Sequence, residues 1–261
     1  MKAIRDKTIW ITGASSGIGK ALALRLAKNN NFVIVSSRGR DSLLELQKTA
    51  PKNIRVLDCD VGDDKAMEEA GDRLASLTDH LDMVFACAGT CEYDDGLKLK
   101  LESYRRVFDA NFFGVVNTLR QALPLLSHSK QPVFAAVGSL SSVVGFPRAE
   151  AYGASKAALG YFLDSVRADT SRVRLHVAHI RPGFIDTPLT KSNDFDMPFM
   201  MTPDAAAESI EKGVLRGRHI IDFPRRLSWP LRFLGFFSSL WFGICTPRMT
   251  RIRSLRKTKC A

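Results

Sequence analysis

The chain has 261 residues, 45% of them hydrophobic and 25% charged, a balance that suits a globular α/β protein and excludes disordered and collagen-like chains. The net charge of +11 lies wholly in residues 212–261, which hold twelve Lys or Arg residues against one acid, Asp222. The rest of the chain is neutral, so the charge indicates a basic C-terminal appendage rather than a basic groove across the fold.

Short apolar runs alternate with longer amphipathic segments along the chain. The apolar runs predict buried parallel strands at Thr8–Thr12, Phe32–Ser36, Ile54–Leu57, Met83–Ala86, Val133–Val137 and Val173–Ile180. Helical periodicity occupies Lys20–Asn29, Asp63–Leu77, Leu101–Leu126 and Ala151–Asp169. This alternation predicts an α/β fold with one doubly wound parallel sheet and helices on both faces. We expect one domain over residues 1–223 and an apolar, basic extension over residues 224–261.

A glycine-rich turn joins the first predicted strand to the first predicted helix. Its sequence is Gly13-Ala14-Ser15-Ser16-Gly17-Ile18-Gly19. Glycines permit a tight turn and let backbone N–H groups approach a pyrophosphate, which the N-terminus of the following helix also favours. The turn therefore predicts a nucleotide site at Gly13, Ser15, Ser16, Gly17, Ile18 and Gly19.

The end of the second strand indicates which nucleotide binds. An acid there would hold the ribose hydroxyls of NAD, whereas an arginine accommodates the 2′-phosphate of NADP. The chain has Ser37 and Arg38 at this place, with no acid before Asp41. A guanidinium offers a two-pronged donor to a phosphate, so we expect NADP(H) to be preferred over NAD(H). The alternative is that Arg38 is a solvated loop residue.

Tyr152 and Lys156 lie four residues apart near the start of a predicted helix, which puts both side chains on one face. A tyrosine with a pKa of about 10 is a poor acid or base at neutral pH. A neighbouring ammonium would lower that pKa, as general acid–base catalysis requires. Alone, this pair is more often an accident of a helix surface.

Together, the turn from Thr12 to Gly19 and the Tyr152-x3-Lys156 pair resemble the short-chain dehydrogenase/reductase family, over about residues 7–223. The resemblance implies a Rossmann-like fold and a homodimer or homotetramer. Ser139 stands 13 residues before Tyr152, the family's spacing for its catalytic serine. Further matches imply cofactor contacts at Asp60, Val61, Ala88, Gly89, Tyr152, Lys156, Pro182, Gly183 and Thr187.

The resemblance also implies a catalytic set of Asn111, Ser139, Tyr152 and Lys156. Ser139 would hydrogen-bond the substrate carbonyl, and Tyr152 would donate a proton to the developing alkoxide. Lys156 would depress the tyrosine pKa and hold the nicotinamide ribose, and Asn111 would position a water that links Lys156 to solvent. We expect a carbonyl reductase; the alternatives are an oxidising alcohol dehydrogenase and a non-catalytic NADP(H)-binding regulator.

Two positions depart from the family's pattern. Cys87 stands where the family often has asparagine, which should weaken local hydrogen bonding without abolishing the chemistry. Near the catalytic serine, Gly138 precedes Ser139, and Ser141 and Ser142 follow. Ser141 therefore remains an alternative to Ser139.

Residues 188–203 mix polar residues with Phe195, Met197, Phe199, Met200 and Met201. This segment, the substrate loop, predicts a mobile apolar flap rather than a strand or long helix. An apolar flap near the site favours a lipophilic carbonyl or alcohol substrate.

The extension combines an apolar stripe with flanking cations. A helix between Pro230 and Pro247 would present Phe233, Phe236, Phe237, Leu240, Trp241 and Ile244 on one side. A helix of about 15 residues is about 22 Å long, too short to span a hydrocarbon core of about 30 Å. The flanking cations are Arg225, Arg226, Arg232, Arg248, Arg251, Arg253, Arg256, Lys257 and Lys259. This pattern predicts an in-plane helix on an anionic membrane through residues 225–261; the alternative is packing on the domain or on a dimer partner.

Other signals are weak or absent. The five cysteines, Cys59, Cys87, Cys91, Cys245 and Cys260, form no CxxC pair, which indicates reduced thiols in the cytoplasm. His176 and His179 would point to opposite faces of a strand, so we expect no metal site. No signal peptide is expected before the first strand. Nucleic-acid binding has the basic end in its favour but no recognition module, and is not expected.

Overall fold

The computed structural model describes residues 3–191 and 193–252, in which a seven-stranded parallel sheet forms the centre. The strands are β1 (Thr8–Thr12), β2 (Phe32–Ser36), β3 (Ile54–Val56), β4 (Met83–Ala86), β5 (Val133–Val137), β6 (His176–Pro182) and β7 (Ile220–Phe223). Their order, β3-β2-β1-β4-β5-β6-β7, reverses direction between β1 and β4. Ligands of open α/β sheets bind at such a reversal, beyond the carboxyl ends of the strands. The predicted fold is confirmed.

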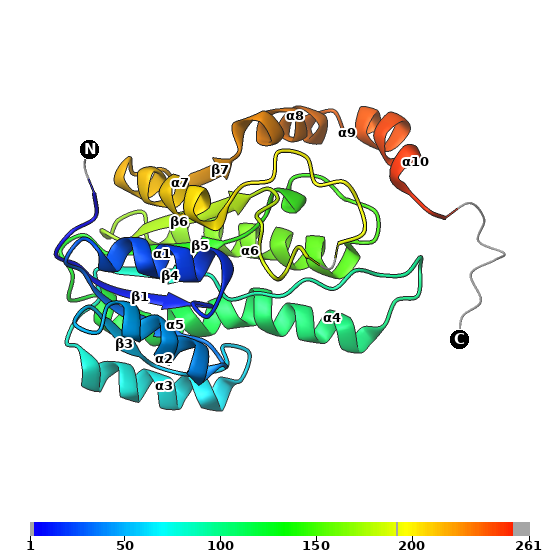
Figure 1. Ribbon diagram of the computed structural model, residues 1–261. Helices are drawn as coiled ribbons and strands as arrows, with labels where there is room; N and C mark the ends of the chain where they lie inside the picture. The colour runs from blue at the N-terminus through cyan, green and yellow to red at the C-terminus, as the bar shows by residue number, and fades with distance from the viewer. Residues whose placement is uncertain (1–2, 192, 253–261) are drawn as a thin grey trace.

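Helices cover both faces of the sheet (Figure 1). They are α1 (Gly17–Ala27), α2 (Arg40–Thr49), α3 (Asp64–Leu77), α4 (Leu101–Phe108), α5 (Gly114–Leu126), α6 (Glu150–Asp169) and α7 (Pro203–Leu215). Successive residues of β1 point to opposite faces. Ile9 and Ile11 belong to a core cluster with residues of α1, α2 and α7, whereas Trp10 belongs to one with residues of α3, α5 and α6. The sheet is therefore packed between two hydrophobic cores, one on each face.

Several predicted bounds need correction. The strand predicted from Val173 starts instead at His176, and Val173 is 60% exposed in the preceding turn. The helix predicted over Leu101–Leu126 is interrupted by a π turn at Asp109–Phe113. The pattern did not name α2, α7 or β7.

The extension is broken rather than one continuous helix. It consists of α8 (Arg225–Phe236), α9 (Ser238–Leu240), a π turn at Trp241–Cys245 and α10 (Thr246–Met249). Trp241 does not belong to the exposed stripe, because it is buried and its indole Nε1 donates to the Gly145 carbonyl at 2.8 Å. Within residues 3–191 and 193–252, no helix is long and apolar enough to cross a membrane. The predicted cations Arg253, Arg256, Lys257 and Lys259, and also Cys260, lie outside the described residues.

Candidate active site

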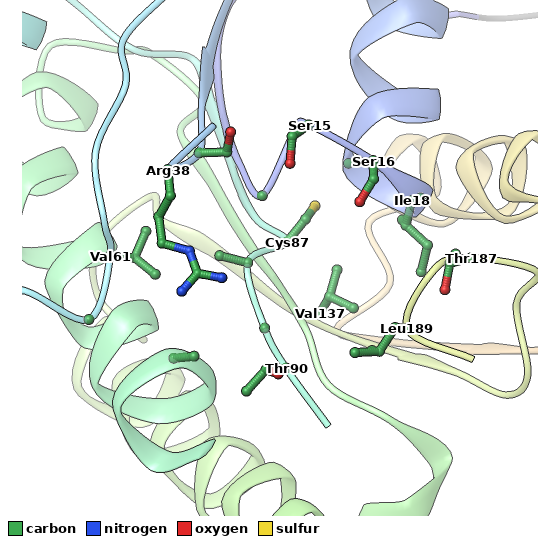
Figure 2. Close-up of a pocket in the computed structure, with 18 of the residues that line it drawn as sticks. Ser15, Ser16, Ile18, Arg38, Val61, Cys87, Thr90, Val137, Thr187 and Leu189 are labelled. Carbon is green, nitrogen blue, oxygen red and sulfur yellow. The ribbon is translucent and has the colours of Figure 1, made fainter. Parts of the chain in front are cut away.

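A cavity of about 910 Å³ lies where the carboxyl ends of the strands meet. Figure 2 shows side chains from several of these strand ends and loops pointing into it. The structure brings together here every predicted cofactor contact, namely Gly13, Ser15, Ser16, Gly17, Ile18, Gly19, Ser37, Arg38, Asp60, Val61, Ala88, Gly89, Tyr152, Lys156, Pro182, Gly183 and Thr187. Asn111 and Ser139 are not in its lining, and both are buried next to residues that are: Asn111 contacts Thr90, and Ser139 follows Gly138.

The glycine-rich turn forms one wall of the cavity. Gly13 has φ +68°, and a Cβ there would lie 2.5 Å from the backbone nitrogen of Ala88. A Cβ on Gly19 would collide with the carbonyl of Gly13. Ser16 caps α1 without a side-chain hydrogen bond, and the first turn of α1 contains no acid. The turn is therefore packed against the backbone that directly follows β4, and the N–H groups at the start of α1 suit the pyrophosphate of a dinucleotide.

Tyr152 and Lys156 reach the cavity from α6. The Lys156 Nζ donates to the Val137 carbonyl at 2.9 Å and lies 5.9 Å from the centre of the Tyr152 ring. Gly89 lies beside it: a Cβ there would lie 3.4 Å from this Nζ, an ordinary contact, but only 2.8 Å from the Asn111 Oδ1. Burial lowers the pKa of Lys156 to about 8. A group with that pKa is mostly charged at neutral pH, so the lysine can act as a cation in the site.

The acid–base character of Tyr152 differs from the sequence-based expectation. Burial and the nearby Cys91 raise the pKa of Tyr152, and a hydrogen bond with Ser139 opposes them. The expected depression by Lys156 is not found, because the effect of burial dominates and the ammonium lies 5.9 Å from the centre of the ring. Ser139, rather than Ser141, supplies the hydroxyl beside Tyr152. The Ser139 Oγ also accepts a hydrogen bond from the Ser141 backbone N–H at 3.1 Å.

Asn111 links the loop after β4 to α6. Its Nδ2 donates to the Thr90 carbonyl and to the Ser155 Oγ, both at 2.9 Å. Its Oδ1 accepts from the Thr90 N–H at 2.8 Å. The side-chain amide is thus hydrogen-bonded to protein groups. A water held by Asn111 would therefore have to bind to the backbone of the π turn that contains this residue. Such π turns are frequent at functional sites.

The cavity also has walls that the motifs did not reveal. They include Thr90, Glu92, Arg106 and Val137. Arg106 of α4 donates to Glu92 through Nη2 at 2.7 Å, which fixes the loop after β4. Thr90 and Glu92 follow the end of β4 and Val137 ends β5, which was an available signal, but no spacing rule singles out any of the four residues. Cys87, in place of the family's asparagine, is a half-buried thiol in the cavity wall, and desolvation raises its pKa to about 12, so it is not a reactive thiolate.

The substrate loop lies beside this site and is held by packing and charge. Its described residues before α7, 188–191 and 193–202, contain no helix or strand apart from the bridge that Met201 forms with Ile185. The Phe195 ring packs edge-on against Tyr93 at a centroid distance of 5.4 Å. Asp194 accepts from Arg148 at 2.6 Å and from Arg251 of the extension at 2.9 Å. Hydrogen bonds from these two guanidinium groups lower the pKa of Asp194 to about 2. At neutral pH the ionised carboxylate therefore ties the loop to the domain through Arg148 and to the extension through Arg251.

Substituting Lys156 should stabilise the protein without nucleotide. At neutral pH, Lys156→Met is expected to raise the free energy of unfolding by on the order of 2 kcal/mol. Burial lowers the lysine pKa to about 8 from 10.5, and each pKa unit corresponds to about 1.4 kcal/mol against the buried charge. Loss of the hydrogen bond to Val137 offsets about 1 kcal/mol of this gain.

The pH dependence of this gain distinguishes its cause. Below pH 8 the lysine is charged in the folded and the unfolded protein, so the burial penalty is fully present. As the pH rises from 8 towards 10.5, the folded protein releases the proton while the unfolded chain keeps it, so the wild type regains stability. Urea unfolding of both proteins at neutral and at alkaline pH should show the difference shrinking. A difference independent of pH would contradict this account.

Clusters of metal-binding side chains are absent from the described part of the chain: no three His, Cys, Asp or Glu residues are placed to hold an ion. The residues around the cavity offer backbone donors, hydroxyls and the cations Arg38 and Lys156, beside carboxylates that include Asp60 and Glu92. The donors and cations suit an anionic organic cofactor.

Known proteins resemble the chain in both sequence and fold. A family model described as short chain dehydrogenase matches residues 7–197. An uncharacterized oxidoreductase of Myxococcus xanthus (strain DK1622) is 34% identical over 252 residues, covering 95% of this chain and 100% of that protein. The 11-beta-hydroxysteroid dehydrogenase A of Sesamum indicum is 28% identical over 242 residues, covering 85% of this chain and 69% of that protein.

Two solved structures show the same fold. A short-chain dehydrogenase/reductase from Burkholderia phymatum in complex with NAD has a TM-score of 0.83 at 16% identity, covering 98% of this chain and 100% of that one. An alcohol dehydrogenase from Thermococcus sibiricus complexed with 5-hydroxy-NADP has a TM-score of 0.74 at 24% identity, covering 83% and 95%. Because the family match spans most of the chain and a relative exceeds 30% identity along its whole length, this chain belongs to the short-chain dehydrogenase/reductase family and is an oxidoreductase that uses a nicotinamide cofactor.

Proposed function

We propose that the protein is an NADP(H)-dependent reductase of lipophilic carbonyl compounds. The observation that carries the proposal is one cavity with Tyr152, Lys156 and Arg38 in its wall and Ser139 hydrogen-bonded to Tyr152. The nicotinamide supplies the hydride in reduction and accepts it in alcohol oxidation. The same residues serve either direction, so oxidation of a secondary alcohol is the second candidate.

Each residue has a role that follows from its position. The Ser139 hydroxyl, fixed by the Ser141 N–H, would hydrogen-bond the substrate oxygen. The Tyr152 hydroxyl would donate its proton to that oxygen as negative charge develops there. Burial keeps this phenol protonated at neutral pH, which suits an acid that must deliver a proton during reduction. Lys156 would hold the nicotinamide ribose and stabilise the phenolate left behind. Asn111 would fix the loop that Gly89 belongs to and so position Lys156.

The cofactor preference rests on Arg38. Its guanidinium points into the cavity near Val61 (Figure 2). Within the described residues Arg38 has no carboxylate partner, whereas its neighbour Arg40 is engaged by Asp58 at 2.5 Å. An unpaired guanidinium in a nucleotide cavity, with no acid on the end of β2, supports recognition of a 2′-phosphate.

Arg38→Gln should raise the KM for NADPH about 10- to 100-fold and leave the KM for NADH nearly unchanged. A hydrogen bond to a charged group contributes about 1.5–3 kcal/mol, and only NADPH has the 2′-phosphate that would receive it. Steady-state kinetics with both cofactors measure this. Arg40→Gln is the matched control, since that side chain already pairs with Asp58, and should not discriminate between them. Wild-type preference for NADH, or equal losses with both cofactors, would refute the assignment.

The lipophilic substrate class rests on the substrate loop. Phe195 packs against Tyr93 and also against Phe184, at a centroid distance of 6.1 Å. Phe199 and Met200 of the same loop are exposed. Aromatic and methionine side chains form adaptable apolar surfaces, and one relative is named as a hydroxysteroid dehydrogenase. NADPH oxidation should therefore improve with apolar length across a panel of aldehydes and ketones. Silence across the panel with NADPH binding intact would favour an alcohol substrate or a non-catalytic regulator.

We also propose that the protein acts in the cytoplasm, peripherally on a membrane, as a homodimer or homotetramer. Free thiols at Cys59, Cys87, Cys91 and Cys245 support a reducing compartment. Exposed apolar side chains on two neighbouring helices support assembly through them, namely Leu101 on α4 and Leu123 on α5.

A further inference from the structure

Helix α8 has two apolar stripes on opposite sides. Leu227, Leu231 and Leu234 form the first, which packs with Leu140 and Val144 in a small core cluster. Trp229, Phe233 and Phe236 form the second at helical spacing, and their side chains are 73%, 58% and 83% exposed. The first stripe already attaches the helix to the domain. The second stripe therefore takes no part in attaching the helix to the domain.

Exposed apolar side chains continue past the end of α8. The Phe237 ring packs tilted against Phe233 and edge-on against Phe236, with ring centroids 4.9 and 5.0 Å away. Further along the chain, Leu240, Phe242 and Ile244 are 41%, 59% and 52% exposed. We call the set of Trp229, Phe233, Phe236, Phe237, Leu240, Phe242 and Ile244 the aromatic face. Figure 1 shows α8, α9 and α10 along the outer edge of the molecule. An exposed apolar surface with this many large side chains marks an interaction site.

The segment that carries the aromatic face has basic side chains and no acidic ones. Between residues 225 and 252 the chain holds five arginines and no acid, and these are Arg225, Arg226, Arg232, Arg248 and Arg251. Arg232 approaches Asp222 at 3.7 Å, and Arg251 binds Asp194. The other three have no carboxylate partner in the described parts of the chain. A partner surface rich in anions would satisfy them.

We infer that the aromatic face docks onto an anionic lipid bilayer. Tryptophan and phenylalanine between arginines are suited to the headgroup region, where rings are buried and guanidinium groups meet lipid phosphates. A second copy of the chain fits poorly, because a symmetric contact would bring arginines against arginines with no acid in the extension to pair them. The inference rests on the proposed peripheral location but not on the proposed reaction.

Docking in this way would turn the substrate side of the enzyme towards the membrane. The backbone of the segment that follows Ser139 touches the extension, since the Gly145 carbonyl accepts from Trp241 and a Cβ on Gly235 would lie 2.9 Å from the Val143 carbonyl. The extension also holds the substrate loop through Arg251 and Asp194. A lipophilic substrate dissolved in the bilayer would then meet the substrate loop first.

Vesicle flotation with the full chain tests the inference. Binding is expected to vesicles of phosphatidylcholine mixed with phosphatidylglycerol, and much weaker binding to phosphatidylcholine alone. Phe233→Ser with Phe236→Ser should lower the partition coefficient at least about tenfold, because burial of each ring contributes about 1.5–3 kcal/mol when complete. Tyr161→Ser is the matched control, since Tyr161 on α6 is 80% exposed but lies outside the aromatic face, and should bind as the wild type does.

A charge variant separates lipid from protein partners. Arg225→Gln with Arg226→Gln should weaken binding to the mixed vesicles about thirtyfold, since each cation near an anionic surface contributes about 1 kcal/mol. Thermal melting and NADPH binding should match the wild type for every variant, which separates this test from any failure of the proposed reaction. No binding of the wild type to the mixed vesicles would overturn the inference. So would dissociation of a dimer by Phe233→Ser with Phe236→Ser in sedimentation, which would assign the face to a second copy.

Discussion

Tyr152→Phe is expected to lower kcat about 10²- to 10⁴-fold while the enzyme still binds NADPH, because general acid–base catalysis by one side chain contributes a factor of this size. The substitution keeps the ring and removes only the hydroxyl. Tyr152 lies on α6 beside buried Ala151 and Ser155, so the ring should stay in place. Lys156 and the glycine-rich turn are untouched, and these are the groups expected to hold the cofactor.

Three measurements together test this role of Tyr152. Turnover is followed with the best carbonyl substrate from the panel, NADPH binding by fluorescence titration, and folding by thermal melting. Tyr161→Phe is the control, since it removes a hydroxyl from the same helix at a side chain that is 80% exposed, and should leave all three unchanged. An active Tyr152→Phe enzyme would refute the assignment. Loss of NADPH binding together with activity would show instead that the phenol supports the cavity.

The fold follows from the sequence wherever strands are buried on both faces. β1 and β5 are buried at every position and read as continuous apolar runs. β7 is only four residues long and lies at the edge of the sheet. Its Asp222 interrupts the apolar pattern, and only the structure shows that Arg181 neutralises this carboxylate at 2.7 Å. A pairing between residues 41 positions apart leaves no local signal.

The part of the site that consists of sequence motifs could be predicted from the sequence. Spacing located the glycine-rich turn, Tyr152 and Lys156, and the structure places them around one cavity. Two features depend on burial instead of spacing. One is the raised pKa of Tyr152, which follows from its surroundings. The other is the break in the extension, where Trp241 turns inward because its indole finds the Gly145 carbonyl and its ring packs on Phe146 at a centroid distance of 5.1 Å.

Gly13→Ala is expected to destabilise the protein by about 2–5 kcal/mol and to abolish NADPH binding. Two costs add at this position. A left-handed backbone costs a residue with a Cβ about 1–2 kcal/mol. The new Cβ would also lie 2.5 Å from the backbone nitrogen of Ala88, and forcing atoms into a packed interior costs typically about 1–3 kcal/mol. The backbone at Cys87 and Ala88 directly follows β4, and the Cys87 N–H donates to the Thr12 carbonyl at 3.2 Å. Because this segment is held to β1, the turn must shift, and the N–H groups expected to hold the pyrophosphate shift with it.

Gly217→Ala separates the two costs, because Gly217 has φ +63° but nothing within 4 Å of a Cβ. It should therefore lose only the backbone part, about 1–2 kcal/mol, and keep full NADPH affinity. Urea unfolding and NADPH titration of both variants give the comparison. A larger loss at Gly13 means that contact with Ala88 fixes the turn, so one glycine serves the fold and the cofactor together. Equal losses, with NADPH affinity preserved in both variants, would mean that the turn yields to the methyl group and that its close packing on Ala88 is not what positions the nucleotide.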